Sequence, residues 1–213
     1  MALSKPSGML VHRGWARDGE VLVDWVRRLT GSDTAHPIHR LDRATSGIVL
    51  FGLSPEIARE LGELFQRNVP RKRYIALVRG RPPESGLIDH PIPRAPGGDR
   101  VPARSSYRRL QTVEASPRDL SLVEVFPATG RLHQVRRHLK HIDHPVIGDA
   151  NYGKGPLNRA VRERYDLSRL ALHALSLEIV HPRSGEALVL VAPLPDDLAG
   201  PLERLGFVEL LTL

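Results

Sequence analysis

Hydrophobic residues in this chain fall mostly in short continuous runs or alternate with polar residues, and both patterns are typical of β-strands. The predicted strands are residues 48–53, 73–78, 107–113, 120–126, 170–180 and 187–192. The last two are joined by Pro182-Arg183-Ser184-Gly185, whose composition predicts a turn. A sheet is therefore expected to be the central feature of the fold.

Fewer segments show helical spacing. Residues 21–29 do, and a second helix is predicted to begin after Ser54-Pro55-Glu56, because Ser suits the N-cap and Pro the first turn. That helix should end near Asn68. A third helix is expected soon after the strand at 120–126, and a closing helix from Pro195 onward.

The remaining segments predict turns and loops. Residues 1–12 are expected to be extended, with a turn at Pro6-Ser7-Gly8. Residues 81–104 are rich in proline and glycine, which predicts a long loop or a loose hairpin. Because strands and helices do not alternate regularly, the order favours an α+β fold with a mixed or antiparallel sheet over a doubly wound parallel sheet.

Composition narrows the choice of partner. The chain has 213 residues, for which we expect a single domain spanning residues 1–213, and Lys plus Arg exceed Asp plus Glu by 31 to 24, a formal net charge of +7. A basic balance of this size favours a polyanionic partner such as nucleic acid. The absence of cysteine excludes disulfides and thiolate metal sites. No apolar stretch has the length of a signal peptide or membrane span, so we expect a cytoplasmic protein.

The strongest chemical signal is His39-Arg40-Leu41-Asp42-Arg43-Ala44-Thr45-Ser46-Gly47, which leads directly into an apolar run. Asp42 lies between two arginines, and the neighbouring positive charge favours its ionised form. A general acid is therefore disfavoured, whereas an anion at a turn can act as a nucleophile or a base. A salt bridge at the entrance of a strand is the structural alternative.

Further motifs accompany this one in a definite order. They are Lys5-Pro6-Ser7-Gly8, Lys72-Arg73-Tyr74-Ile75-Ala76-Leu77-Val78-Arg79-Gly80, Thr129-Gly130-Arg131-Leu132-His133-Gln134-Val135-Arg136, His144-Pro145-Val146-Ile147-Gly148-Asp149 with Tyr152-Gly153, and Leu172-His173-Ala174. With the Asp42 segment, they make nearly the whole chain resemble the RluA-type family of RNA pseudouridine synthases. The resemblance implies an α+β pseudouridine synthase fold, in which a central mixed sheet and flanking helices surround a basic active-site cleft.

The resemblance also implies roles for three residues and no cofactor. Asp42 matches the family's essential aspartate, as nucleophile or base, and Arg136 matches the arginine that pairs with it. Tyr74 matches the tyrosine that lies against the target uracil, where it is a candidate for the proton step at C5. The alternatives are a solvated helix arginine and a core tyrosine. Val146 or Ile147 would line an apolar pocket floor, or simply belong to the core.

Phosphate contacts are expected from cations around these motifs, as affinity for RNA requires. The expected RNA-binding residues are Arg40, Arg43, Arg71, Lys72, Arg73, Arg104, Arg131, His133, Arg137 and Lys140. His133, His138, His141 and His144 crowd into one segment, but their helical positions and the lack of a fourth ligand argue against zinc. We therefore expect no metal, and the histidines are interpreted as part of the basic surface.

Within the family, the chain resembles the branch that modifies uridine 65 in the acceptor arm of bacterial tRNA, on the evidence of Leu10-Val11-His12-Arg13-Gly14-Trp15, Arg136-Arg137-His138-Leu139 and Arg169-Leu170. Ribosomal RNA is the alternative substrate, and a catalytically idle RNA-binding protein is the alternative function. We expect no S4-type RNA-binding domain, and the segment before Lys5 is shorter than is usual in the family. A monomer is expected by analogy with the family.

Overall fold

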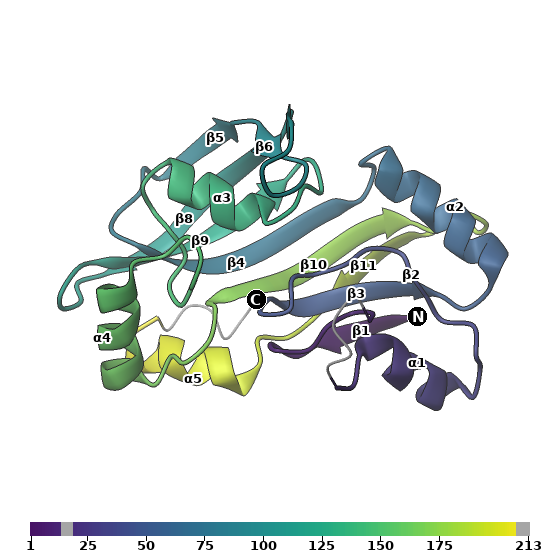
Figure 1. Ribbon diagram of the computed structural model, residues 1–213, viewed down its shortest axis with the longest axis horizontal. Coiled ribbons are helices and arrows are strands. Elements are labelled where there is room, and N and C mark those ends of the chain that lie inside the picture. The colour runs from purple at the N-terminus through teal and green to yellow at the C-terminus, as the bar shows by residue number, and fades with distance from the viewer. Residues whose placement is uncertain (14–18, 208–213) are drawn as a thin grey trace. The chain divides into compact units, whose positions relative to one another are not determined.

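The computed structural model describes residues 1–13 and 19–207, which form two compact units (Figure 1). The first unit comprises Met1–Lys72 and Ala174–Pro193. The second begins at Arg73, runs to His173 and resumes at Leu194. Each unit has its own sheet segment.

In the first unit the central strand is β3 (Ser46–Gly52), and all seven of its residues are buried. Burial on both faces explains why residues 48–51 within it are an unbroken apolar run instead of alternating with polar residues. Strand β1 (Ala2–Lys5) pairs with it in antiparallel fashion, as does the short β2 (His36–Pro37). The strand order continues from β3 to β10 (Leu172–Val180), which pairs antiparallel with β11 (Ala187–Val191).

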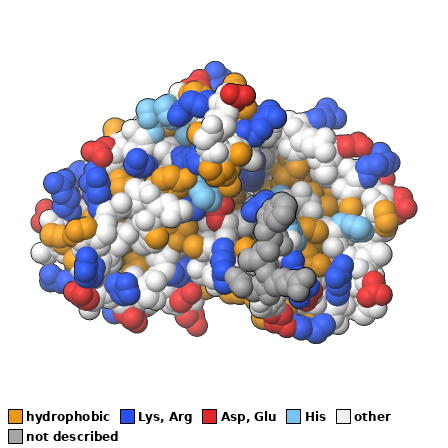
Figure 2. All heavy atoms as spheres, in the orientation of Figure 1, with side chains coloured by type: hydrophobic (Ala, Val, Ile, Leu, Met, Phe, Trp, Pro, Cys, Tyr) orange, Lys and Arg blue, Asp and Glu red, His pale blue; other side chains and the backbone are white. Residues whose placement is uncertain are grey.

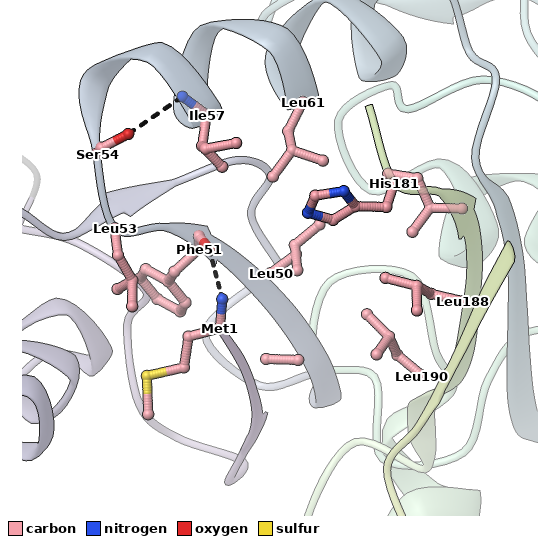
Figure 3. A pocket seen from close by; sticks show the side chains of 12 residues that line it. Met1, Leu50, Phe51, Leu53, Ser54, Ile57, Leu61, His181, Leu188 and Leu190 are labelled. Carbon is pink, nitrogen blue, oxygen red and sulfur yellow. Dashed lines mark hydrogen bonds between the residues drawn. The ribbon is translucent and has the colours of Figure 1, made fainter. Parts of the chain in front are cut away.

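The described residues of the first unit include two helices. Helix α1 (Leu22–Thr30) ends at Gly31, whose left-handed backbone is typical of a helix C-cap. Helix α2 (Pro55–Gln66) begins as predicted, with the Ser54 hydroxyl accepting a hydrogen bond from the Ile57 N–H. Helix α2 packs on β3, and an apolar pocket of about 440 Å³ lies between α2 and the β10–β11 turn, with Leu50, Leu188 and Leu190 among its lining (Figure 3).

In the second unit four strands follow one another in the order β4 (Arg71–Arg79), β9 (Leu120–Pro127), β8 (Arg104–Val113) and β5 (Ser85–Asp89). All three pairings are antiparallel. A small ribbon of β6 (Ile92–Pro93) and β7 (Arg100–Val101) adjoins them in sequence. Helix α3 (Gln134–His141) packs on β9, and α4 (Gly155–Tyr165) contacts α5 (Asp196–Arg204).

The predicted strands and the four predicted helices are confirmed, as is the α+β class; a parallel bridge between Leu10 and Val21 accompanies the antiparallel ladders. The prediction for residues 81–104 was incomplete, because β5 lies within them and joins the sheet. Of the apolar residues in β5, only Ile88 is buried. The hydrophobic pattern of β5 is therefore too short to predict a strand within a segment rich in proline and glycine. Helix α4 was not predicted, since its buried face consists of Leu157 and Val161 alone.

No helix among the described residues is both long and apolar enough to span a membrane.

Gly47 provides a test of this architecture. Its φ is +121°, and a Cβ added there would lie 2.2 Å from the backbone oxygen of Ala174. Gly47→Ala should therefore destabilise the protein by roughly 3 kcal/mol or more, through strain and a backbone clash, as measured by urea unfolding. Gly62→Ala is the matched control, because Gly62 lies within α2 with open space around it. That variant should gain about 0.5–1 kcal/mol. Equal midpoints for the two variants would contradict the described packing.

Candidate active site

Asp42 lies in a turn immediately before β3, as predicted. The turn is closed by the Thr45 N–H, which donates to the Asp42 carbonyl over 3.0 Å. The Lys5-Pro6-Ser7-Gly8 segment lies against the same turn: the Gly8 N–H donates to the Arg43 carbonyl over 2.8 Å, and the Ser7 hydroxyl donates to the Ala44 carbonyl over 2.8 Å. Two motifs that are distant in sequence therefore form one structure around the partly buried aspartate.

Lys5 joins these two segments through a buried ammonium group. Its side chain is fully buried, and Nζ donates to the carbonyls of Pro6, Met9 and Arg43 over 2.8–3.1 Å. A buried charge is tolerated only when hydrogen bonds compensate for its lost hydration. Lys5 therefore stabilises the Asp42 turn only in the conformation that directs these carbonyls toward it.

His39, at the start of the His39–Gly47 motif, is held by two contacts. Its ring stacks on Phe65 of α2 with centroids 4.8 Å apart, and its Nε2 accepts a hydrogen bond from the Leu50 N–H over 3.1 Å. Burial of the ring, together with the nearby charge of Lys72, lowers the pKa of His39 to about 4. The imidazole is therefore neutral near pH 7, as its role as an acceptor requires.

Tyr74 belongs to the second unit, on β4. It pairs with Val125, which pairs in turn with Tyr107, so these residues point to one face of the sheet. Ser105, two residues before Tyr107, shares that face. The side chains of Gln134 and His138 on α3 bond the Ser105 hydroxyl, at 3.1 and 2.9 Å. Tyr74 and helix α3 are therefore on the same face.

Gln134 fixes the start of α3. Its amide oxygen accepts hydrogen bonds from the Thr129 hydroxyl and the Arg131 N–H, at 2.7 and 3.0 Å, while its amide nitrogen donates to the Arg104 carbonyl over 2.8 Å. His133, just before the helix, has a left-handed backbone with φ 54°. Such a conformation is uncommon for a residue with a Cβ and occurs where the surroundings enforce it.

Arg136 forms a buried, bidentate ion pair with Asp149. Its Nε donates to Oδ2 over 2.7 Å and its Nη2 to Oδ1 over 2.9 Å, with side-chain exposures of 7% and 0%. Burial by itself raises the pKa of Asp149, but hydrogen bonds from Arg136 and from the backbone of Tyr152 and Asn151 outweigh burial and lower the pKa below its ordinary value. Both groups are thus charged near pH 7.

Tyr152 lies beside the same arginine. The Arg136 and Arg137 guanidinium carbons are 5.1 and 5.6 Å from its ring centroid, within the range of cation–π contacts. Its hydroxyl accepts a hydrogen bond from Arg137 Nε over 2.8 Å and lies 3.0 Å from His133 Nδ1. Two of the predicted RNA-binding residues, His133 and Arg137, therefore meet at one tyrosine.

Other predicted RNA-binding cations are distributed over both units, and several take part in ion pairs. Arg73 bonds the buried Glu124, which it shares with Arg108, a residue outside the predicted set. Arg104 pairs with Asp89, and Arg71 pairs with Glu178. In Figure 2, Lys and Arg side chains are spread across the visible face with acidic groups among them. Arg40, Arg43, Arg131 and Lys140 are exposed, and Lys72 and Tyr74 are partly buried.

The interpretation of the histidines as a basic surface is wrong for His138. That residue is fully buried; its Nε2 donates to the His90 carbonyl over 3.0 Å, and burial lowers its pKa. The helix directs the His138 side chain toward β8, where it contacts Ser105. The basic neighbours Arg137 and Lys140 had suggested an exposed position instead. Within the described residues, no group of three histidines or acids is arranged to hold a metal ion.

Comparison with known proteins identifies the family. The family described as RNA pseudouridylate synthase matches residues 1–141, which include Asp42, Tyr74 and Arg136. The chain belongs to the RNA pseudouridylate synthase family. The predicted enzyme class, an isomerase that forms pseudouridine in RNA, is confirmed.

Relatives extend the match over the whole chain. The tRNA pseudouridine synthase C of Salmonella typhimurium is 40% identical, covering 99% of this chain and 88% of that protein. The protein of the same name from Vibrio cholerae is 36% identical, covering 100% and 95%. The solved structure of human RNA Pseudouridylate Synthase Domain Containing 4 superposes with a TM-score of 0.75 at 29% identity, covering 96% of this chain and 89% of that one. The predicted pseudouridine synthase fold is confirmed.

The structure places Tyr74 and Arg136 in one unit and Asp42 in the other, so the pairing of Arg136 with Asp42 stays a prediction. Val146 and Ile147 are both buried, and Ile147 bonds to the backbone of Leu77. Sequence reasoning did not assign a role to Asp149. The sequence does place Asp149 at the end of the His144–Asp149 motif, next to the apolar Val146 and Ile147. Nothing in the sequence, however, links Asp149 to Arg136.

His39 should make stability depend on pH. Unfolded His39 takes up a proton below about pH 6.5, whereas in the folded protein it does so only near pH 4. The unfolded state binds more protons in this window, so the free energy of unfolding should fall as pH falls from 6.5 to 4, by on the order of 3 kcal/mol at most. His39→Gln keeps an acceptor for the Leu50 N–H but cannot titrate.

Urea unfolding at several pH values measures this effect, with the exposed His12→Gln as the control. We expect His39→Gln to have a flatter pH dependence than either the wild type or the control. An identical slope in all three proteins would show that His39 is not the residue responsible.

Proposed function

We propose that this enzyme isomerises a specific uridine of tRNA to pseudouridine, with Asp42, Tyr74 and Arg136 as its catalytic residues. The relatives named tRNA pseudouridine synthase C span nearly the whole chain at 36–40% identity, which supports tRNA as the substrate. The observation that carries the catalytic assignment is the intact Asp42 motif, held by hydrogen bonds to the Lys5–Gly8 segment. Position 65 is the target that the resemblance favours.

The reaction rearranges one nucleotide and needs no oxidant, reductant or water. The bond from ribose C1′ to uracil N1 breaks, the base turns, and C1′ bonds to C5. The proton on C5 is then lost and N1 gains one, so atoms and electrons balance. Asp42 supplies the anion that attacks or deprotonates the sugar, and Tyr74 lies against the base and assists the proton transfer at C5.

Access to the base requires it to leave the RNA stack, because C1′ and C5 of a stacked or paired nucleotide are shielded. The aromatic ring of Tyr74 offers a stacking face for the extruded uracil. Arg136 orients and stabilises the Asp42 carboxylate, a task suited to a planar guanidinium.

Binding of the RNA is assigned to cations that contact phosphates. The proposed set is Arg40, Arg43, Arg71, Lys72, Arg73, Arg104, Arg131, His133, Arg137 and Lys140. Several of these side chains also make ion pairs within the protein, such as Arg104 with Asp89. A single catalytic domain acting as a monomer in the cytoplasm, without cofactor or metal, completes the proposal.

Asp42→Asn should abolish turnover while leaving tRNA binding within about threefold, since it removes a charge but little volume. We expect at least a thousandfold loss of tritium release from tRNA carrying 5-tritiated uridine, comparable to losing a nucleophile elsewhere. Asp33→Asn, at an exposed acid of the same unit, is the control and should keep the wild-type rate. Wild-type turnover by Asp42→Asn would refute the assignment.

The substrate is identified by carbodiimide mapping of tRNA and ribosomal RNA from cells lacking the gene, complemented with wild type or Asp42→Asn. The expected result is the loss of one tRNA mark that only the wild type restores. A mark lost from ribosomal RNA would redirect the proposal to that substrate. Unchanged marks in every RNA, with binding retained, would instead favour the idle RNA-binding protein.

The affinity for tRNA should fall steeply with salt. If about six phosphates are contacted, log K should fall with log salt concentration with a slope of about −4. Fluorescence anisotropy with the Asp42→Asn variant measures binding without turnover. Lys140→Gln should reduce the slope by about one, whereas Arg183→Gln, outside the proposed set, should leave it unchanged. A flat salt dependence would contradict the phosphate contacts.

A further inference from the structure

The Arg136–Asp149 pair fixes a guanidinium in one orientation. Two of the three guanidinium nitrogens, Nε and Nη2, are bonded to the two carboxylate oxygens of Asp149. This fork-to-fork geometry sets the plane and the direction of the guanidinium group, which a single contact would not do. Nη1 is thereby directed away from the carboxylate.

Asp149 is itself held by the backbone. Its Oδ1 also accepts hydrogen bonds from the Asn151 and Tyr152 N–H groups, over 2.9 and 3.0 Å. The carboxylate therefore has four hydrogen bonds within the second unit: two from Arg136 and two from the main chain. Its position is determined by the fold of its own loop, independently of Arg136.

That loop has little freedom to move. A Cβ on Gly148 would lie 1.9 Å from the Arg169 carbonyl oxygen, so the two backbones are in close contact. The Gly148 N–H donates to the Asn158 side chain over 3.0 Å, and the Asn158 amide donates to the Asp149 carbonyl over 3.1 Å. The Ile147 N–H bonds to Leu77 on β4 over 2.9 Å. Asp149 is thus attached through its backbone to the strand that carries Tyr74.

We propose that Asp149 is a positioning residue of the isomerisation, which holds Arg136 in its catalytic orientation without touching the substrate. The inference rests on the proposed role of Arg136. Loss of the hydrogen-bond partner that orients a metal ligand typically costs ten- to a hundredfold in affinity or activity, and we expect an effect of the same order for the partner of Arg136. Tyr152 contacts both members of the pair. Its N–H donates to Asp149, and its ring centroid lies 5.1 Å from the Arg136 guanidinium carbon.

A purely structural ion pair is the alternative, and kinetics separates it from positioning. A structural pair would affect the amount of folded enzyme, whereas positioning affects kcat of the enzyme that is folded. Asp149→Asn should lower kcat ten- to a hundredfold and leave KM for tRNA within threefold, with concentrations corrected for the folded fraction. Asp149→Glu keeps the charge but not the fork geometry and should also lower kcat, which provides a second test if the Asn variant folds poorly.

A double-mutant cycle tests whether Asp149 acts through Arg136. Arg136→Met should lower kcat more than Asp149→Asn does, and the double variant should be no slower than Arg136→Met alone. Asp197→Asn is the matched control, because it breaks another arginine–aspartate pair of the same unit, Arg169–Asp197. Its kcat should stay within twofold of wild type.

The outcomes distinguish this inference from the proposed function. Wild-type kcat in Asp149→Asn or Asp149→Glu, with Arg136→Met inactive, would overturn the role of Asp149 alone. A double variant slower by the product of both single losses would overturn it too, because Asp149 would then act independently of Arg136. Wild-type kcat in Arg136→Met would overturn both the catalytic role of Arg136 and the positioning role of Asp149.

Discussion

The cost of burying positive charge governs the local structure of both units. Lys5 is fully buried in the first unit and Arg136 is nearly so in the second. An ammonium or guanidinium group removed from water is tolerated only where oxygen atoms surround it at hydrogen-bonding distance. For Lys5 those oxygens are the carbonyls of Pro6, Met9 and Arg43, the last in the Asp42 turn, and for Arg136 they are the carboxylate oxygens of Asp149. Burial of either cation therefore requires the segments that carry these oxygens to be in place.

The two buried cations satisfy their hydrogen-bond donors in different ways, which follow from the chemistry of each group. The Lys5 ammonium has three donors and satisfies three carbonyl oxygens that point in different directions, which joins two separate segments. Arg136 has a planar fork and matches a single carboxylate, which sets its orientation. In the proposed mechanism, the first arrangement holds the turn that carries Asp42 and the second orients the Arg136 guanidinium, and groups held in place in this way favour catalysis.

The basic composition describes the RNA-binding surface only in outline. Arg73 and Arg108 both bond the buried Glu124, so part of the positive charge compensates a carboxylate inside the protein. His138 also shows that a basic segment is not all surface, because it is a neutral core residue within such a segment. Net charge predicts a polyanionic partner, but burial and pairing decide which cations face it.

The sequence by itself determined the family and the α+β class, and it supplied the catalytic residues that we propose. Local patterns sufficed there, because residues 48–51 of β3 form an apolar run and the Ser54 hydroxyl caps α2 by a local hydrogen bond. Tertiary structure decided what local patterns do not encode. Strand β5 is formed by pairing with β8, and Asp149 is paired with Arg136, 13 residues earlier, because the fold brings the two side chains together. Such contacts depend on side-chain direction and burial across the chain, and neither is set by the neighbours of a residue in sequence.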